Sequence, residues 1–356
     1  MSSVLFYTPL PPIRGGIPKH SLALAKAIEK KGQIVVYAPS KLYPNFIYPG
    51  NTQFDNLQGP TETLPFKVVR ASDVRLIYRI ARATKFGTVM LPWWTNGRFI
   101  PTFVTLWLAR VKKINSVLIC HNVLPHSHSR LTRWLASVIL RMAKTHTVQS
   151  KAEAQLLKGI VAESNPIITP HPAWEQHLTR AKQKHDVPTF LFFGLIREYK
   201  GIRDLLSAVK LLDKNLRVRI VIMGEVWGKE LRQLLASAAS EDERLELQLG
   251  YASDEQANDA FSNARAILLP YRSATGSGVL AQAKTFGVPV IFTDVPPFNE
   301  EVIDGKDGLL IEKMRPEQLS ETISALAASP GLLNTPWEET NFTWDDFANE
   351  ILSLVS

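Results

Sequence analysis

The sequence predicts an α/β protein with two doubly wound parallel sheets, each in a Rossmann-like unit. Short, continuously apolar runs alternate with helical patterns from one end of the chain to the other. Such runs are typical of strands that are buried on both faces of a parallel sheet. The length of 356 residues suits two hydrophobic cores, and a content of 45% hydrophobic and 21% charged residues is that of an ordinary globular protein.

The first unit begins with a strand, a helix and a second strand. Residues 3–9 are mostly apolar, residues 18–32 have the amphipathic spacing of a helix, and residues 33–39 are mostly apolar again. Further strands, each after a helical pattern, are predicted at 88–93, 116–122 and 145–150. Strands joined by helices run parallel, because each connection has to cross back over the sheet.

The second unit repeats this order after a polar, proline-rich passage. Its strands are expected at 189–194, 217–224, 244–250, 264–270, 288–294 and 308–312. We therefore expect a first domain at 1–172, a linker at about 173–186 and a second domain at 187–335, with a last helix within 340–356. Paired units of this kind usually bind a ligand in the cleft between the carboxyl ends of their strands.

The single cysteine and the lack of long apolar segments predict where the protein works. Cys120 alone cannot form a disulfide framework, which fits a reducing cytoplasm. The start of the chain lacks the basic residues that precede the apolar core of a signal peptide. No run reaches the roughly 18 to 20 apolar residues that span a bilayer. We expect a cytoplasmic protein, either soluble or peripheral on the inner face of the membrane.

Positive charge is concentrated in the first half of the chain. Residues 1–180 contain 23 Lys and Arg against 7 Asp and Glu, whereas residues 181–356 contain 18 against 26. Between Asp73 and Glu153 there are 13 Lys and Arg and no acidic residue. This imbalance indicates a polyanionic partner for residues 74–152, which can be an anionic membrane surface, a phosphate-bearing substrate or nucleic acid. A basic face that contacts only solvent remains the alternative.

A helical pattern at 129–144 favours the membrane among these partners. Its apolar stripe consists of Leu131, Trp134, Leu135, Val138 and Met142, with Arg130, Arg133, Arg141 and Lys144 nearby. An amphipathic helix of this kind can lie on an anionic bilayer. A helix that packs the same stripe into the core remains the alternative.

Three loops follow strands and contain groups that suit an anion. Gly15 and Gly16 precede the first helix, where bare backbone and the helix N-terminus favour a negative ligand; a tight turn explains them equally well. Arg197 and Lys200 follow the strand at 189–194 and offer a fork and a point charge to a diphosphate, unless they are solvated loop cations.

The third loop, RSATGSG (272–278), comes between an apolar strand and a helix. Its hydroxyl groups and the bare backbone of Ser277 and Gly278 suit a phosphate at the helix N-terminus. The competing interpretation is that Ser277 or Thr275 merely caps the helix.

Together these motifs resemble glycosyltransferase family 4. GLIREYKG and, about 70 residues later, LLPYRSATGSGVLAQAKTFGVPVIFTDVPPFNEEVIDGKDGLL are similar to its donor domain, and the Gly-Gly loop, LPWWTNG and ICHNVLPH agree in the first half. The GxIRxYKG and SATxSG loops resemble a subgroup without the family's usual glutamate pair. The resemblance implies a GT-B fold, a C-terminal helix that returns to the first domain, and sugar transfer from a nucleotide-sugar with retention of configuration and without a metal.

The resemblance also implies roles for particular residues. The diphosphate-binding Arg and Lys fall on Arg197 and Lys200, although the family's Arg usually lies two places earlier, at Leu195. His121 matches a histidine near the transferred sugar. The remaining ligand-binding positions are Gly15, Gly16, Ser277, Gly278, Gln282 and Glu300.

Two departures concern the glutamate pair, which would fall at Ala274 and Gln282. Gln282 can accept a hydrogen bond from a ribose hydroxyl without carrying charge, whereas Ala274 has no polar group to offer. Recognition of the donor sugar is therefore the step in which this chain differs most from the family pattern.

We accordingly expect a hexosyltransferase that uses a UDP-sugar or GDP-sugar, with no cofactor and no metal. The acceptor would be a glycan or a lipid-linked molecule in the synthesis of cell-surface polysaccharide or glycolipid. A catalytically silent glycosyltransferase-like subunit is the alternative. A nucleic-acid reader motif and a dinucleotide fingerprint are both missing, which disfavours a nucleic-acid binder, an epimerase or a dehydrogenase. A metal site from His121, His126, His128 and His146 is disfavoured because no carboxylate or cysteine shares the spacing.

Overall fold

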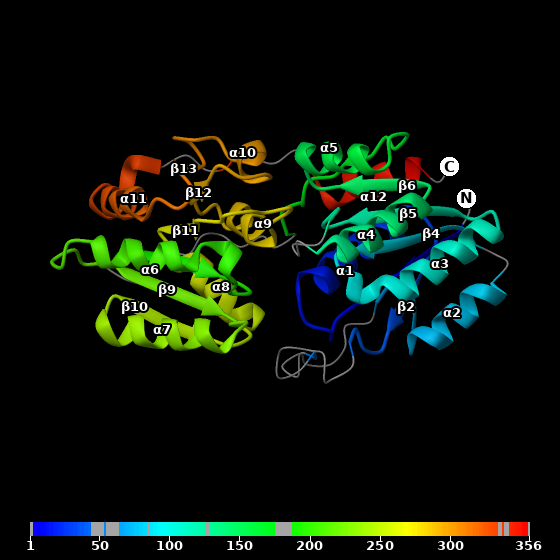
Figure 1. Cartoon of the computed structure of the whole chain (residues 1–356), viewed down its shortest axis with the longest axis horizontal. Helices are drawn as coiled ribbons and strands as arrows, with labels where there is room; N and C mark the ends of the chain where they lie inside the picture. The colour runs from blue at the N-terminus through cyan, green and yellow to red at the C-terminus, as the bar shows by residue number, and fades with distance from the viewer. Residues whose placement is uncertain are drawn as a thin grey trace. The chain divides into compact units, whose positions relative to one another are not determined.

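The computed structural model describes residues 3–43, 53–54, 64–83, 86–124, 129–174, 187–333, 337 and 342–354. The chain forms two compact units, coloured from blue to red along the chain in Figure 1. Unit 1 contains Met1–Pro172 together with Phe342–Ser356, and unit 2 contains Ala173–Asn341. Of the expected linker, residues 175–186 lie outside the described residues.

Unit 1 is built on a seven-stranded parallel sheet with the strand order β3-β2-β1-β4-β5-β6-β7. Its strands are β1 (Ser3–Tyr7), β2 (Ile34–Pro39), β3 (Lys67–Ala71), β4 (Phe86–Trp93), β5 (Asn115–Cys120), β6 (Thr145–Val148) and β7 (Ile167–Ile168). The order changes direction at β1, so right-handed connections on its two sides cross opposite faces of the sheet. The doubly wound parallel sheet predicted from the apolar runs is confirmed.

The helices of unit 1 cover both faces of this sheet. On one face, α1 (Gly16–Glu29) packs against the C-terminal helix α12 (Trp344–Ser353). The opposite face carries α2, α3, α4 and α5, each in contact with the next (Figure 1). Their bounds are α2 (Asp73–Arg82), α3 (Phe99–Val111), which follows the 3-10 turn η1 (Asn96–Arg98), α4 (Arg130–Met142) and α5 (Lys151–Ile160).

Two strands of unit 1 were not predicted from the sequence. β3 lies at an edge of the sheet and reads KVVRA, with exposed cations beside half-buried valines. β7 contains only two residues at the other edge. A strand at the edge of the sheet has a neighbouring strand on one side only, so fewer of its residues have to be apolar. The pattern of continuous burial that reveals the central strands is therefore missing.

Unit 2 is built on a six-stranded parallel sheet with the order β10-β9-β8-β11-β12-β13. Its strands are β8 (Thr189–Phe193), β9 (Arg219–Gly224), β10 (Leu245–Leu249), β11 (Ala266–Leu269), β12 (Val290–Thr293) and β13 (Gly308–Ile311). Its helices are η2 (Glu198–Lys200), α6 (Ile202–Leu211), α7 (Lys229–Glu241), α8 (Asp254–Asn263), α9 (Gly278–Thr285), α10 (Phe298–Glu301), α11 (Pro316–Ala328) and η3 (Pro330–Leu333). The predicted strands of this half are confirmed to within two residues.

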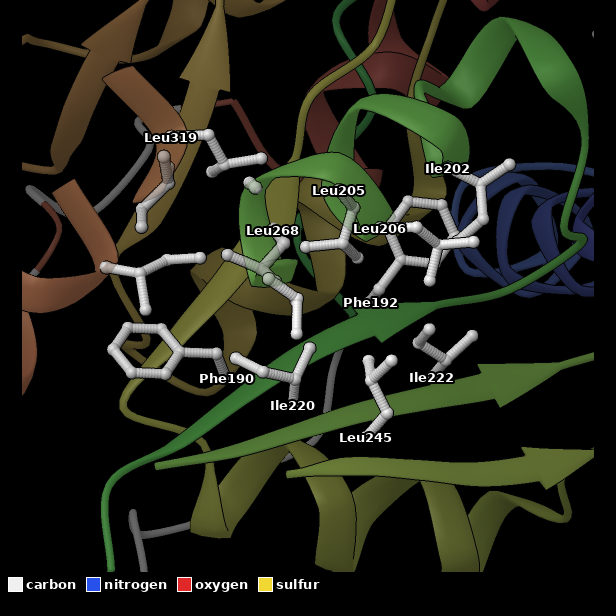
Figure 2. Packing of buried hydrophobic residues seen from close by; sticks show 14 of the residues in the cluster. Phe190, Phe192, Ile202, Leu205, Leu206, Ile220, Ile222, Leu245, Leu268 and Leu319 are labelled. Carbon is white, nitrogen blue, oxygen red and sulfur yellow. The ribbon is translucent and has the colours of Figure 1, made fainter. Parts of the chain in front are cut away.

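The core of unit 2 shows why α6 forms where it does. Ile202, Leu205, Leu206 and Val209 recur at the spacing of one helix face, and all four are buried. Figure 2 shows this face lying on the side chains of β8 and β9, among them Phe192. Burying such a side chain contributes about 1.5–3 kcal/mol, so packing rather than helix propensity stabilises the helix that follows the Arg197 and Lys200 loop.

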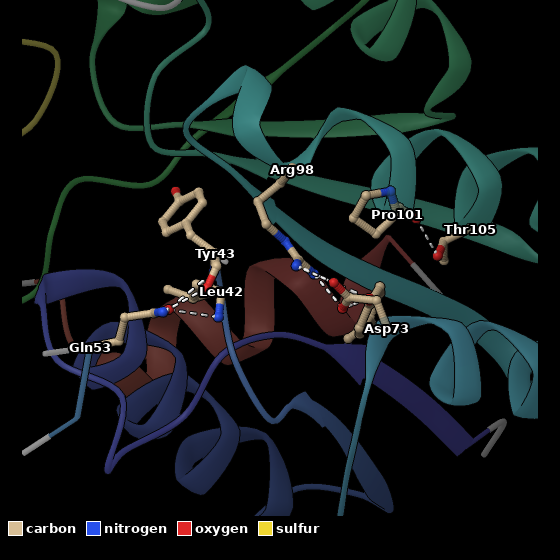
Figure 3. A network of polar contacts seen from close by, with 8 residues as sticks. Leu42, Tyr43, Gln53, Asp73, Arg98, Pro101 and Thr105 are labelled. Atoms are coloured by element: carbon tan, nitrogen blue, oxygen red, sulfur yellow. Dashed lines mark hydrogen bonds and ion pairs between the residues drawn. The ribbon is translucent and has the colours of Figure 1, made fainter. Parts of the chain in front are cut away.

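An ion pair between a buried arginine and a half-buried aspartate joins two helices of unit 1. Asp73 in the first turn of α2 accepts hydrogen bonds from Arg98, with Nη1–Oδ2 and Nη2–Oδ1 distances of 2.6 and 2.9 Å (Figure 3). Arg98 is 5% exposed, and Tyr7 also hydrogen-bonds to both side chains. Two parallel hydrogen bonds fix the geometry of an Arg–carboxylate pair. They therefore hold α2 against the start of α3.

Nearby, Gln53 orders the chain after β2. Its Oε1 accepts hydrogen bonds from the backbone amides of Leu42 and Tyr43, each at 3.0 Å (Figure 3). Its Nε2 donates to the carbonyl of Tyr43. Among the described residues, no helix is long and apolar enough to cross a membrane.

Candidate functional site

Three glycines shape the turn at the end of β8. Gly194, Gly201 and Gly224 have φ angles of 97°, 74° and 141°, in the region that L side chains avoid. A Cβ on Gly201 would collide with the carbonyl oxygen of Pro270, and one on Gly224 with that of Gly194. The chain segments that follow β8, β9 and β11 therefore approach more closely than any side chain would permit.

Lys200 is buried in this turn. The side chain is 6% exposed, and its ammonium group donates a 3.4 Å hydrogen bond to the carbonyl of Phe193 and lies 5.2 Å from the ring centre of Tyr271. Burial, followed by the charge of Arg197, lowers the pKa of Lys200 to about 7. No carboxylate in the described part of the chain forms an ion pair with it. A negative ligand would supply the missing counter-charge.

Arg197 lies immediately before η2 and is ordered by an aromatic ring. The central carbon of its guanidinium lies 3.8 Å from the ring centre of Trp227, which follows β9. Arginine stacks on indole while its N–H groups remain able to form the fork that matches a phosphate. The structure therefore brings Arg197 and Lys200 together, as the loop sequence predicted.

The start of α9 lies beside the same turn. A Cβ on Gly194 would be 3.2 Å from the Lys200 Nζ and 3.4 Å from the Cγ2 atom of Val279. The Ser277 hydroxyl accepts a 3.1 Å hydrogen bond from the Leu280 amide, so it is an N-cap. The capping interpretation of Ser277 is therefore correct for its hydroxyl. An anion would instead meet the first backbone amides of the helix, at Gly278 and Val279.

The loop between β11 and α9 is fixed to α6. Arg272 forms a bidentate ion pair with Asp204, with Nη2–Oδ1 and Nε–Oδ2 distances of 2.7 and 3.0 Å. Its backbone amide also donates to the carbonyl of Tyr199. Because both anchors hold the loop next to η2, the α9 N-terminus is positioned before any ligand arrives.

The other predicted residues of unit 2 have different environments. Gln282 is half-buried in α9, and Ala274 packs half-buried against the apolar cluster on this side of the sheet. Glu300 is exposed in α10. The neighbouring Glu301 is 2.6 Å from Lys284 in a largely buried ion pair. Glu301 therefore has a structural partner, and ligand-binding roles for Gln282 and Glu300 stay predictions.

In unit 1, the Gly-Gly loop forms the start of α1. Gly15 precedes the helix with a φ of 116°, and Gly16 is its first residue. Both are exposed, no side chain caps this helix end, and a Cβ on Gly16 would contact nothing within 4 Å. The backbone of Gly15 and Gly16 is thus accessible, and Gly15 is required by its backbone angle.

His121 follows β5 and belongs to a buried cluster of aromatic rings. Its Nδ1 atom lies 3.2 Å from the Nε2 atom of Gln149, and its Nε2 atom has no hydrogen-bond partner among the described residues. The ring of His20, one turn into α1, is 4.6 Å away, and His171 and Trp344 pack on His20 in turn. The structure therefore brings His121 close to the helix that begins at Gly16.

Glu153 holds the segment that follows His121. Its carboxylate accepts a 2.6 Å hydrogen bond from the Val123 amide, and burial raises the pKa of Glu153 to about 7. Its own backbone amide is capped by Ser150. The position of His121 is thus set from three sides, by Glu153 through Val123, by Gln149 and by α1.

The buried histidines predict that acid destabilises unit 1. Burial lowers the pKa of His121 to about 3 and that of His20 well below 6.5. Below about pH 6.5 the unfolded chain therefore binds protons that the folded chain does not bind. The free energy of unfolding falls as the pH decreases toward 3. Each histidine contributes a slope of up to about 1.4 kcal/mol per pH unit. Glu153 opposes this between pH 7 and 4.5, because its raised pKa stabilises the fold as the pH falls.

Urea unfolding at several pH values between 7 and 4.5 measures this slope. In the variant His20→Gln one titrating group is removed, so the free energy of unfolding should fall less steeply with decreasing pH. An unchanged slope in the variant would show that His20 does not carry the effect.

Other residues of the LPWWTNG motif and of the histidine set lie outside these clusters. Trp93 is 1% exposed in the core of unit 1, whereas Trp94 is half-buried. His146 is buried and hydrogen-bonds to the Leu140 carbonyl and to Ser164, while 126 and 128 lie outside the described residues. In the described part of the chain, no three His, Cys, Asp or Glu side chains gather as a possible metal site.

Four residues near the predicted groups were not found from the sequence. Trp227 and Tyr271 pack on Arg197 and Lys200, and both follow strands, so an aromatic residue just after a strand was an available signal. His20 and Gln149 contact His121. No sequence pattern indicated a functional role for His20 or Gln149, because a single polar residue within an apolar pattern usually has a structural role.

The comparison with known proteins finds a family match in the second unit. Residues 175–341 match the family model Glycosyl transferases group 1. The chain is 24% identical to the D-inositol 3-phosphate glycosyltransferase of Pseudarthrobacter chlorophenolicus, over 89% of this chain and 83% of that protein. It is 27% identical to the GDP-mannose:glycolipid 4-beta-D-mannosyltransferase of Xanthomonas campestris pv. campestris, over 48% of each chain.

Solved structures confirm the predicted GT-B fold. Anabaena HepE in complex with UDP and glucose has a TM-score of 0.76 and 15% identity, covering 99% of this chain and 100% of that one. The sucrose-phosphate synthase from Thermosynechococcus elongatus has a TM-score of 0.75 and 17% identity, covering 99% and 98%. The TM-scores show a shared fold with two parallel-sheet α/β units.

Proposed function

We propose that this chain, which carries a group 1 glycosyltransferase domain in unit 2, transfers a hexose from a UDP-sugar or GDP-sugar to a glycan or lipid-linked acceptor. We assign it to glycosyltransferase family 4, and transfer proceeds with retention of anomeric configuration. The acceptor belongs to cell-surface polysaccharide or glycolipid synthesis. The enzyme works in the cytoplasm, including the inner face of the membrane.

The buried ammonium of Lys200 is the observation that carries this proposal. It is 6% exposed, burial and the charge of Arg197 lower its pKa to about 7, and it lies beside Gly194, which also neighbours Val279 of α9. Burying a cation without a carboxylate is costly unless a ligand supplies negative charge. A pyrophosphate fits this place, because it accepts from the Arg197 fork, from Lys200 and from the amides of Gly278 and Val279.

The same groups favour departure of a nucleoside diphosphate. Negative charge grows on the leaving oxygen as the glycosidic bond breaks, and donors fixed beforehand in a dry site stabilise that charge by several kcal/mol. Arg197 is fixed by Trp227, and the α9 loop by the pair between Arg272 and Asp204. The diphosphate is therefore bound more tightly as it leaves, without a metal ion.

His121 is proposed to contact the transferred sugar or the acceptor hydroxyl. With Gln149 donating to Nδ1, the neutral ring carries its proton on Nε2, the atom that has no partner among the described residues. Burial keeps the pKa of His121 at about 3, so the ring stays neutral at pH 7. In this form it donates a hydrogen bond from Nε2 to a sugar oxygen.

A thermal-shift screen tests the donor. The chain is heated with UDP, GDP, ADP and the corresponding nucleotide-sugars, and the correct donor should raise the melting temperature. At a concentration 100 times the dissociation constant the stabilisation is about 2.7 kcal/mol. Release of the nucleoside diphosphate is then followed with that donor and candidate acceptors. A shift that is absent with every nucleotide would contradict the proposal.

A silent subunit that has the fold without the activity is the second candidate. The position of the family's first glutamate is occupied by Ala274, which packs against apolar side chains. This candidate predicts no melting shift with any nucleotide-sugar, so the same screen separates the two.

A further inference from the structure

The outer surface of α2, α3 and α4 has an unusual composition, and we call it the basic face. The three helices are consecutive neighbours on one side of the unit 1 sheet (Figure 1). Their inward sides pack into the core through residues such as Leu76, Leu106 and Ile139. Their outward sides carry two kinds of side chain.

The first kind is large and apolar. Seven such side chains on these helices are more than half exposed, namely Val74, Tyr78, Ile100, Trp107, Val111, Leu131 and Trp134. Trp134 and Leu131 are 61% and 63% exposed, so the stripe on the helix at 129–144 does not pack into the core at these positions. Single exposed apolar residues are common, but a gathering on three adjacent helices indicates an interaction surface.

The second kind is cationic. Exposed Arg and Lys side chains on α2, α3, α4 and their ends are Arg75, Arg79, Arg82, Arg110, Lys113, Arg130, Arg133, Arg141 and Lys144. The sequence contains no acidic residue between Asp73 and Glu153, and Asp73 itself is engaged by Arg98 (Figure 3). The positive charge of this face is therefore not neutralised by carboxylates of its own helices.

We propose that the basic face docks on an anionic lipid bilayer, with its tryptophans and aliphatic side chains in the headgroup region and its cations against lipid phosphates. Tryptophan and tyrosine favour this interface because one end of the ring is apolar and the other polar. Arginine and lysine gain from the negative surface potential. Both properties occur here on three adjacent helices, of which α2 and α3 are joined by the Asp73–Arg98 pair.

The apolar side chains distinguish a bilayer from nucleic acid. A polyphosphate backbone satisfies the cations, but offers no apolar medium to Val74, Ile100, Val111 and Leu131. A bilayer offers an apolar medium to these side chains and negatively charged phosphates to the cations. This inference concerns a surface of unit 1 and does not depend on the proposed transfer reaction.

The 356-residue chain is mixed with vesicles of phosphatidylcholine alone or with 30% phosphatidylglycerol, and the bound fraction is measured by co-sedimentation over a salt series. Binding is expected only to the anionic vesicles and should weaken as salt rises. The double variant Arg79→Glu with Arg133→Glu should lower the vesicle partition coefficient by about 25-fold or more, since each basic residue near the surface contributes about fivefold. Trp107→Ser with Trp134→Ser should lower it roughly tenfold at every salt concentration.

The matched control is Lys229→Glu with Arg232→Glu, which makes the same charge change at exposed positions of α7 in unit 2. It should keep most of the binding, and melting curves verify that all variants are folded. Equal losses in the control, or no binding to anionic vesicles at low salt, would overturn the proposal. The proposal would also be overturned if the protein bound an oligonucleotide tightly but did not bind vesicles, and if only the unit 1 charge variant weakened the oligonucleotide binding. Nucleotide-induced melting shifts in the same variants report the donor site separately.

Discussion

The variant Lys200→Met is expected to lower sugar transfer by at least about a hundredfold while the protein stays folded. The ammonium is buried beside Gly194, which also lies next to Val279 in the first turn of α9, and a methionine fills similar space without charge. Folding should not suffer. The pKa of Lys200 is lowered from 10.5 to about 7, so between these values the unfolded chain binds the proton more tightly and the buried amine destabilises the fold.

Steady-state kinetics with a saturating acceptor measure the loss, and a melting curve verifies the fold. The matched control is Lys214→Met, which removes an exposed lysine of the same unit and should leave turnover unchanged. Transfer by Lys200→Met at the wild-type rate would remove this residue from the site and with it the main support for the proposed function.

The pKa of Lys200 also predicts a pH dependence of donor binding. A bound diphosphate raises this pKa, so above pH 7 binding has to take up a proton and the affinity falls by up to about tenfold per pH unit. A nucleotide-sugar is the suitable probe, because its diphosphate does not titrate in this range. Lys200→Arg stays charged throughout, and its affinity should not follow the same curve.

The variant Gly224→Ala is expected to destabilise unit 2 by at least about 3 kcal/mol. Its φ of 141° is strained for alanine, and the added Cβ would collide with the backbone carbonyl of Gly194. The collision separates the end of β9 from the turn that carries Arg197 and Lys200, so donor binding should be lost as well.

Gly287→Ala is the control that isolates the collision. Gly287 has a φ of 62°, but a Cβ there would meet nothing within 4 Å. Its substitution should cost about 1–2 kcal/mol through backbone strain alone. Melting curves of both variants provide the comparison, and equal losses would show that the close approach of β8 and β9 is not important for stability.

The sequence predicted the sheets well because a buried strand corresponds to a short run of apolar residues in the sequence. Residues 117–120 and 190–193 are continuously apolar, and they form most of β5 and β8. Edge strand β3, in which Lys67 and Arg70 are exposed, has no such apolar run and was not predicted. Sequence also predicted that Arg197 and Lys200 share a loop after a strand, because a strand, a glycine and a helix in succession form a tight connection.

Other features were decided only by tertiary contacts. The pKa of Lys200 depends on its burial, and the position of Arg197 depends on stacking with Trp227. The position of His121 depends on Gln149 and His20, which are 28 and 101 positions away in the chain. The Ser277 hydroxyl is used by its own helix, which the motif alone left open. Sequence periodicity reports which residues face a core, whereas the partners of a buried polar group come from segments that the fold brings together.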